Sequence, residues 1–574
     1  MKKFIYSILL LVFFTGCDSD LLDLQSLTEP TDATFFSNEQ ELDLALTGVY
    51  NSLVWLGGYT MPVQVAMDNG ATDVGLVRGG FTGFDELGAG SHSANTGGFQ
   101  STYAHMYRGI GRANNLINNL DRASGVVSQA RLNQIKYEAM VLRAYFYHYL
   151  VFLFGDVPYN DQIITNPADG LLPRVNREQV IDNILADLAE AAQNLPATAS
   201  ERNRVFRDVA LGLHARVALY AGRYREAATS SLAVIKGGNL TLHPNYEQLF
   251  TPAGEGSREG ILAMPFRDGF GPLPQFPTAQ GSRVFGAFSV VVPTQSMVDS
   301  YEAIDGLPID QSSVYDPTRP FENRDPRLKA SIITPQSHWG GIIFESHKDS
   351  LIVRNVNGTV RGQNNDSRTV IWPAAFCGYL WKKYTNEASQ MINRGWSDTD
   401  FILMRYAEIL LIYAEAKIEL NEIDASVHNA LNRVRARAYG VAVEDTQSYP
   451  AVTSTDRSFL RTLIKRERKV EFANEGLRFF DIRRWQIAHK VLPVPLFGRV
   501  LDFANARYTP SIDEDGFVSY AGIEHQYDLN TDARFPNAVR IFNNPRDYLL
   551  PIPQAEIDTY RANGATLPQN PGGY

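Results

Sequence analysis

Cysteine is almost absent from this chain, because among its 574 residues only Cys17 and Cys377 carry a thiol. Two cysteines exclude a disulfide framework and a zinc site built from several thiolates. The 10 histidines include no pair at the spacing of a zinc-binding helix with a glutamate between them. We therefore expect a fold that depends neither on disulfides nor on a metal ion.

Motifs for nucleotide cofactors, for a catalytic serine and for a complete calcium loop are missing as well. The sequence contains no Walker loop, no dinucleotide fingerprint and no Gly-x-Ser-x-Gly nucleophile elbow. The segment 528–539 begins like a calcium loop, but Ala533 replaces the glycine and Val539 replaces the bidentate glutamate. We predict a turn there rather than a calcium site, and we expect no cofactor.

Positive charge is in short supply. Lys and Arg number 53 against 63 Asp and Glu, which gives a net charge of -10. This balance argues against nucleic acid as a partner and against electrostatic binding to anionic lipid. Hydrophobic residues make up 44% of the chain, enough for a substantial core, and aromatic residues make up 11%. The aromatic share is high for a helical protein and indicates binding surfaces.

Long hydrophobic runs are limited to one, at the N-terminus. Lys2 and Lys3 precede the apolar run 4–14, and Gly16 precedes Cys17. The run is shorter than the roughly 20 residues that cross a bilayer, so it predicts a secretory signal rather than a membrane span. We expect residues 1–16 to be removed and Cys17 to carry several acyl chains that hold the protein at a membrane. The alternative is an ordinary cleaved signal in which Cys17 is incidental.

Helical periodicity dominates residues 39–236 and 400–490, after a predicted tether at 17–38. Ser37 or Asn38 is placed to cap the first helix. Further helices are expected at 99–120, 128–154, 177–195, 204–220 and 224–236, and between 401 and 438.

Two helix pairs have the pattern of a tetratricopeptide hairpin. The matching positions are Ala215, Gly222, Tyr224 and Ala227 in the first pair, and Ala414, Asn421, Ile423 and Ser426 in the second. Asn can replace Gly at a left-handed helix end. We therefore predict a mainly α fold built on a tetratricopeptide-like scaffold of helical hairpins.

Three segments lack this periodicity. Residues 56–100 contain repeated glycines, which exclude a long helix and predict a loop-rich excursion. Residues 237–399 are rich in Pro, Gly and aromatics, with short β-like runs at 289–292 and 351–353, and residues 491–574 are similarly irregular. We expect one domain, 39–574, in which the insertion at 237–399 folds against the helices as small sheets and binds the ligand.

Three carboxylates, Glu467, Glu471 and Glu475, recur every four residues on one predicted helix face. Aligned carboxylates repel one another unless cations lie opposite. The cations nearby in sequence are Arg433, Arg435, Arg437, Arg478, Arg483 and Arg484. We predict a structural ion-pair network.

The same interpretation applies to Arg405, Glu408 and Glu415, which we expect to pair with neighbouring helices. The competing hypothesis is a secreted glycosidase that uses Glu467 and Glu471 as its two carboxylates.

Long motifs in these charged helices resemble the SusD/RagB family. They are Arg405 to Ala416, Asn432 to Arg437 and Glu467 to Trp485. Shorter matches, each in family order, are Leu142 to Ala144, Phe154 to Pro158, Asn323 to Leu328, Tyr548 to Pro553 and Gln569 to Gly572. The agreement covers nearly the whole chain. It implies a SusD-like fold whose irregular part binds a nutrient, usually an oligosaccharide, without catalysis.

The resemblance also implies a location and a partner. Family members are surface lipoproteins of the outer membrane, and they act as the lid of a SusC-like TonB-dependent transporter. The acidic stretch 18–23 fits an export signal for the outer face, or is only a solvated linker. We expect a protein bound to the outer membrane through its lipid alone and facing the extracellular side.

Sugars stack on aromatic rings and are oriented by a few polar groups, so candidate ligand-binding residues are aromatics on loops with polar neighbours. They are Trp55, Tyr59, Asp68, Asn69, Asp73, Arg78, Phe81 and Phe84 in the first excursion, and Phe270, Trp339 and Trp372 in the insertion. Phe276 and Trp396 are further aromatics of the same kind. Family members also use the stretch before the helix near residue 100, but residues 92–99 contain no Trp here. We expect at least two of Trp55, Trp339 and Trp372 to lie at or beside the site.

Glycan capture is therefore the leading hypothesis. Peptide capture, as in the RagB branch, is the first alternative, and the glycosidase is the second. A soluble intracellular repeat scaffold conflicts with the lipid attachment expected at Cys17.

Overall fold

The computed structural model describes residues 35–78, 82–371, 376–385, 387, 395–529 and 538–574. The predicted signal, Cys17 and most of the tether lie outside these residues, as do Phe81, Trp372 and residues 530–537 of the calcium-like segment. Across the described ranges, no helix is long and apolar enough to cross a bilayer.

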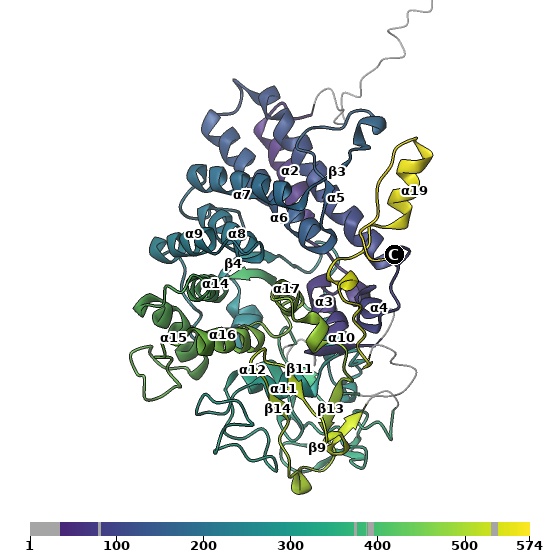
Figure 1. Ribbon diagram of the computed structural model, residues 1–574, viewed down its shortest axis with the longest axis vertical. Helices are drawn as coiled ribbons and strands as arrows, with labels where there is room; N and C mark the ends of the chain where they lie inside the picture. The colour runs from purple at the N-terminus through teal and green to yellow at the C-terminus, as the bar shows by residue number, and fades with distance from the viewer. Residues whose placement is uncertain (1–34, 79–81, 372–375, 386, 388–394, 530–537) are drawn as a thin grey trace, which may run out of the picture.

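The helices of the N-terminal half stack one after another (Figure 1). They are α2 (Glu39–Asn51), α5 (Gly97–Asn119), α6 (Gln129–Phe154), α7 (Arg177–Asn194), α8 (Arg207–Tyr220) and α9 (Tyr224–Gly237). Asn38 caps α2 by accepting a hydrogen bond from the amide of Glu41 at 3.1 Å, and Ser128 caps α6. The predicted helices are confirmed, with ends that differ by a few residues.

The array continues with α14 (Tyr406–Glu419), α15 (Ala425–Tyr439) and α16 (Arg457–Glu471). α14 packs directly on α9, so the two predicted hairpins are neighbours although the insertion separates them in sequence (Figure 1). Gly222 and Asn421 adopt left-handed φ values of 73° and 57° at the hairpin turns, as their positions predicted. The mainly α, tetratricopeptide-like scaffold is therefore confirmed.

One predicted helix start is wrong. Residues Phe401–Arg405 form strand β12, which pairs antiparallel with β4 (Gly260–Met264) of the insertion. The helix begins only at Tyr406, because the backbone before it is hydrogen-bonded to a strand that is distant in sequence.

The excursion at 56–100 contains no long helix, as predicted, but much of it is not loop. It holds α3 (Val63–Ala71), β1 (Gly75–Val77) and α4 (Phe84–Ala89), and every residue of α3 is buried. Its glycines allow close packing: a Cβ atom on Gly88 would lie 2.0 Å from the carbonyl oxygen of Gly70. Glycines that indicated flexibility thus let two short helices touch.

The insertion and the C-terminal part form small sheets below the helices (Figure 1). A four-stranded antiparallel sheet has the order β10-β9-β8-β7. Its strands are β7 (His338–Trp339), β8 (Ile342–Ile343), β9 (Ile352–Asn355) and β10 (Val360–Gln363). The two-stranded pairs are β1 with β5 (Val291–Pro293), β6 (Ile332–Ile333) with β11 (Leu380–Trp381), β13 (Phe497–Val500) with β16 (Tyr527–Leu529), β14 (Ser511–Ile512) with β15 (Val518–Ser519), and β2 (Val157–Pro158) with β3 (Arg174–Val175).

Short helices connect these sheets to the array. They are α10 (Phe276–Gln280), α11 (Gln295–Ser300), α12 (Arg327–Ser331), α17 (Arg478–Arg484), α18 (Ala488–Val491) and α19 (Gln554–Ala562). Of these, α11 and α12 pack against α16, and α19 lies beside α5 (Figure 1). The predicted β-like runs at 289–292 and 351–353 overlap β5 and β9.

Candidate functional site

The aligned carboxylates of α16 form a buried ion-pair network, as predicted. Glu471 lies 2.6 Å from Arg405 Nη1 and 2.9 Å from Arg327 Nη1, and Arg437 is a third partner. Glu467 lies 2.6 Å from the same Arg327 nitrogen. Sequence reasoning missed Arg327, Glu259 and Lys383 as members, because they belong to the insertion.

The arrangement leaves Glu471 without a catalytic proton. Burial raises the pKa of Glu471, but the guanidinium groups of Arg437, Arg405 and Arg327 outweigh that effect and hold the pKa well below its ordinary value. Glu467 and Glu471 have side chains 1% and 0% exposed. Both carboxylates of the glycosidase hypothesis are therefore buried and ion-paired.

Of the other charged residues that were expected to form ion pairs, only some do so. Glu408 pairs with Arg216 at 2.5 Å and Glu415 with Arg484 at 2.5 Å. Arg483 instead places its guanidinium 3.6 Å from the ring centroid of Phe479, and burial lowers its pKa to about 9. Arg433 donates to the hydroxyl of Tyr406.

Two aromatic residues predicted at the ligand site are core residues, which corrects that prediction. Trp55 is 5% exposed, and its ring packs edge-on against Tyr149 at 5.3 Å between centroids. Phe84 is 0% exposed and packs against Phe99 and Phe479. The chain around them is covered by α5 and α6, a tertiary effect that their loop-like sequence surroundings did not show.

Three polar candidates are likewise bound within the protein. Asp68 accepts hydrogen bonds from the amides of Gly476 and Phe479 at 2.7 and 3.2 Å. Asn69 accepts from the indole of Trp381, and Asp73 pairs with Lys469 and Arg478 at 2.8 and 2.9 Å. All three are buried, so they join the excursion to the segment after α16 and present nothing to a ligand.

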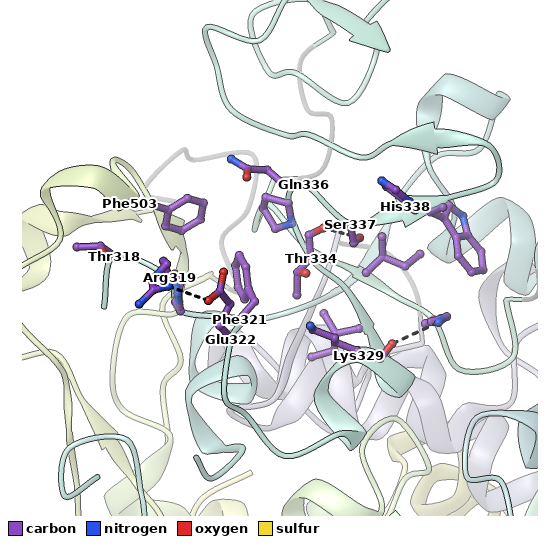
Figure 2. A pocket seen from close by; sticks show the side chains of 16 residues that line it. Thr318, Arg319, Phe321, Glu322, Lys329, Thr334, Gln336, Ser337, His338 and Phe503 are labelled. Carbon is purple, nitrogen blue, oxygen red and sulfur yellow. Dashed lines mark hydrogen bonds and ion pairs between the residues drawn. The ribbon is translucent and has the colours of Figure 1, made fainter. Parts of the chain in front are cut away.

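Trp339 lines a surface groove of about 550 Å³ but is itself 3% exposed. Figure 2 shows this groove, with Lys329 and His338 along its wall and the rings of Phe321 and Phe503 packed together. The two rings lie 5.4 Å apart, edge to face. The indole is buried and the two half-buried rings pack on each other, so this groove offers less open ring area than fully exposed rings would.

Exposed aromatic rings gather elsewhere, beside α10. Phe270, Phe288 and Trp396 are 78%, 42% and 46% exposed, and the half-buried ring of Tyr59 lies 6.2 Å from that of Phe288. We call these four residues the aromatic surface. Tyr59 and Phe270 were predicted site residues and Trp396 was noted beside them; Phe276 is buried and stacks on Tyr384 at 5.0 Å.

Phe288 was missed by sequence reasoning. It directly precedes the predicted β-like run 289–292, and Ser289, the first residue of that run, has a φ of 42° and turns the chain. Phe288 is therefore exposed while Val290 is buried. The small polar residue between Phe288 and the three valines was the available signal.

Hydrogen bonds between separate segments hold the aromatic surface together. Gln275 donates its amide to the carbonyl of Tyr59 at 3.1 Å, and Ser397 donates to Pro274 at 2.9 Å. Thr278 donates through its hydroxyl to Gly395, beside Trp396, at 3.0 Å. The segment 274–278 thus bridges the excursion and the chain before β12.

The backbone at Tyr59 is strained. Tyr59 and Thr60 have φ values of 56° and 45°, a region that costs free energy for residues other than glycine. The hydroxyl of Thr60 donates to Leu273 at 2.5 Å, which holds this conformation. Such strain is typical of positions where the surrounding structure presents a side chain for binding.

Guanidinium groups border the aromatic surface. Arg78, a predicted site residue, donates its amide to Val290 at 2.9 Å, and Arg283 donates through Nη2 to the carbonyl of Phe288 at 2.7 Å. Ring faces with hydrogen-bond donors beside them can bind a hydroxyl-rich ligand. Among the residues described, no group of His, Cys, Asp and Glu is arranged to hold a metal ion.

Comparisons with known proteins agree with this architecture. A family model described as "SusD family" matches residues 269–574, more than half of the chain, and one described as "Starch-binding associating with outer membrane" matches residues 24–219. The SusD-like protein P2 of Formosa agariphila is 26% identical over the whole of both chains. A SusD-like protein of Bacteroides ovatus is 25% identical, covering 97% of each chain.

Solved structures share the fold. A SusD-like carbohydrate binding protein from Bacteroides fragilis has a TM-score of 0.76 at 24% identity, covering 92% of this chain and 99% of its own. A laminarin binding SusD-like protein has a TM-score of 0.66 at 20% identity, covering 93% and 100%. The family models, the curated relatives and the fold agree with the motifs of the charged helices, and the chain belongs to the SusD family.

Proposed function

We propose that this protein is a non-catalytic binding protein that captures oligosaccharides at the aromatic surface. The observation that carries the proposal is the convergence of Tyr59, Phe288 and Trp396, from three segments distant in sequence, on one exposed area. Phe270 lies on the exposed loop that leads into the bridging segment 274–278. Exposed rings otherwise cost solubility, and sugars stack on them. The names of similar solved structures, which include carbohydrate, laminarin and glycan binding, support the same ligand class.

The proposal includes a place and a partner. Lipid at Cys17 would hold the protein on the extracellular side of the outer membrane, and the tether 17–38 would let it act as the lid of a SusC-like TonB-dependent transporter. The support is the family's description as associating with the outer membrane and the short apolar run before Cys17. Affinity purification of the lipidated protein from native membranes should yield a TonB-dependent barrel; recovery without any barrel would contradict this part.

Calorimetry against matched panels of oligosaccharides and peptides tests the ligand class. We expect heat of binding from at least one oligosaccharide series, with affinity that rises with chain length until the aromatic surface is covered. A peptide signal together with silence from every sugar would favour the RagB-like alternative instead.

The absence of catalysis is tested separately. The buried ion pairs of Glu467 and Glu471 support a binding role, because neither carboxylate reaches solvent. Incubation of the purified protein with the oligosaccharides that it binds should release no new reducing ends. Hydrolysis that follows the protein through purification would overturn the proposal.

A further inference from the structure

We infer that the captured oligosaccharide is anionic, with carboxylate or sulfate groups that Arg78, Arg283 and Arg361 recognise at the aromatic surface. The inference rests on the proposed function and names the chemical class of its ligand. The charged groups that border the rings, and not the rings themselves, indicate this class of ligand.

These arginines have no carboxylate partner among the residues that the structure describes. Within the described part of the chain, no carboxylate forms an ion pair with Arg78, Arg283 or Arg361, or with Arg267 on the neighbouring loop. Some exposed arginines elsewhere are paired, such as Arg225 with Glu422, whereas others, such as Arg258, bond only to backbone carbonyls. Unpaired guanidinium groups at one place are notable in a chain of net charge -10.

Two of the cations lie close together. Arg78 and Arg283 are both hydrogen-bonded to the short segment 288–290, the first through its amide and the second through Nη2. Burial lowers the pKa of Arg283, and the positive charge of Arg78 lowers it further. The protein thus maintains a repulsion between like charges, which an anion between them would relieve.

The carboxylate of Asp366 offsets only part of this positive charge: its negative charge raises the pKa of Arg283, yet burial and Arg78 outweigh that effect. Asp366 accepts hydrogen bonds from the hydroxyl of Ser282 at 2.5 Å and from the backbone amide of Arg283 at 2.8 Å. Burial raises the pKa of Asp366 to about 6, although its hydrogen bonds with Ser282 and Arg283 act in the opposite direction. Its bonds hold the backbone of η8 (Arg283–Phe285) and leave the guanidinium of Arg283 facing Phe288.

Two further cations rest on rings. The guanidinium of Arg361 lies 5.0 Å from the ring centroid of Phe285, and that of Arg267 lies 5.1 Å from that of Phe270. Stacking on a ring orients the planar group and leaves its N–H edge for a ligand. That edge matches carboxylate and sulfate oxygens in a bidentate manner. Arg361 thus lies against η8, the short helix that carries Arg283, and several guanidinium edges suit a repeating anionic chain better than a single one.

Matched pairs of oligosaccharides test the inference. The probes are an oligouronate and its carboxyl-reduced neutral form, and a sulfated oligosaccharide and its desulfated form, each measured by calorimetry at 50 and 300 mM NaCl. We expect the charged member of at least one pair to bind at least tenfold more tightly, with affinity that falls as salt rises. The pair that shows the difference identifies the anion.

Variants assign the effect to residues. Arg361→Gln and Arg283→Gln should each weaken binding of the charged member at least fivefold and reduce its salt dependence, and the loss should be smaller for the neutral member. Arg225→Gln, at an exposed ion pair on α9, is the matched control and should bind like the wild type. Thermal unfolding checks that each variant is folded.

Failure of the inference and failure of the proposed function would give different results. Equal affinity for charged and neutral members would overturn the inference while the proposed function stands. Binding to no member of either pair, nor to any neutral glycan, would instead contradict the proposed function. A loss in Arg225→Gln as large as that in Arg361→Gln would show that only net charge matters and would overturn the assignment.

Discussion

The rings of Tyr59 and Phe288 lie 6.2 Å apart between centroids and are tilted by 60°, although one residue follows α2 and the other belongs to the insertion. Their open, tilted arrangement leaves ring area for a ligand, unlike the covered rings of the core. The proposed binding surface therefore exists only where the excursion and the insertion meet.

Removing an exposed ring should weaken binding without unfolding the protein. Phe288→Ala and Trp396→Ala are each expected to lower oligosaccharide affinity by about two- to tenfold, because a stacked ring contributes about 0.5–1.5 kcal/mol. Calorimetry measures the change. The control is Phe459→Ala on α16, whose ring is 45% exposed but does not belong to the aromatic surface. This variant should bind normally. Equal losses in all three variants would contradict the assignment.

Trp55 should behave in the opposite way. Trp55→Ala removes a buried ring and is expected to lower the free energy of unfolding by about 3–5 kcal/mol. Urea denaturation followed by circular dichroism measures this. The protein that remains folded should keep its affinity, since Trp55 packs against Tyr149 and not against a ligand. An intact stability with lost binding would restore Trp55 to the site.

The buried network should be costly to break. Glu471→Gln leaves Arg405, Arg437 and Arg327 short of one negative charge, and breaking a buried pair costs about 3–5 kcal/mol. Chemical denaturation measures the loss. The control is Glu422→Gln at the exposed pair with Arg225, where solvent screens the charges and no measurable change is expected. A Glu471→Gln variant as stable as the wild type would mean that the network is dispensable.

Acid should destabilise the fold through the half-buried side chain of His214. Burial lowers the pKa of His214 from 6.5 to about 4, and its ring lies 2.9 Å from the hydroxyl of Ser230. Between these values the unfolded chain binds a proton that the folded protein does not, so the free energy of unfolding falls as pH falls from about 6.5 to about 4. Denaturation at several pH values measures the slope. His214→Gln should flatten it, and an unchanged slope in that variant would refute the assignment.

The anchor should affect transport and not binding. Cys17→Ala is expected to leave the affinity of the purified protein unchanged, because Cys17 precedes the folded part by the length of the tether. Uptake of the bound glycan by cells should fall. Mass spectrometry of the mature N-terminus checks for acyl chains. A loss of affinity in Cys17→Ala would show that the anchor was misinterpreted.

Helix positions could be predicted from the sequence because their signals are local. Asn38 caps the helix that it was expected to cap, and Gly222 and Asn421 make the expected left-handed turns. The four-residue spacing of Glu467, Glu471 and Glu475 likewise predicted an ion-pair network. Its partners Arg327 and Lys383 belong to the insertion, and no local sequence pattern predicted them.

The candidate site was predicted less well, since burial depends on what packs from elsewhere. Trp55, Asp68, Asn69, Asp73 and Phe84 have the composition of a binding loop, yet α5, α6 and the segment after α16 cover them. Only Tyr59, Arg78 and Phe270 of the described candidates lie at the aromatic surface, and Phe288 was absent from the prediction.

The sequence by itself determined the periodic helices, their caps and turns, and the motifs of the SusD family, because hydrophobic spacing and backbone preferences act over a few residues. Which aromatic rings are exposed, and which arginines of the described ranges form no ion pair with a carboxylate, followed only from the tertiary structure. Both depend on contacts between distant segments, such as the bonds from Gln275 to Tyr59 and from Arg283 to Phe288.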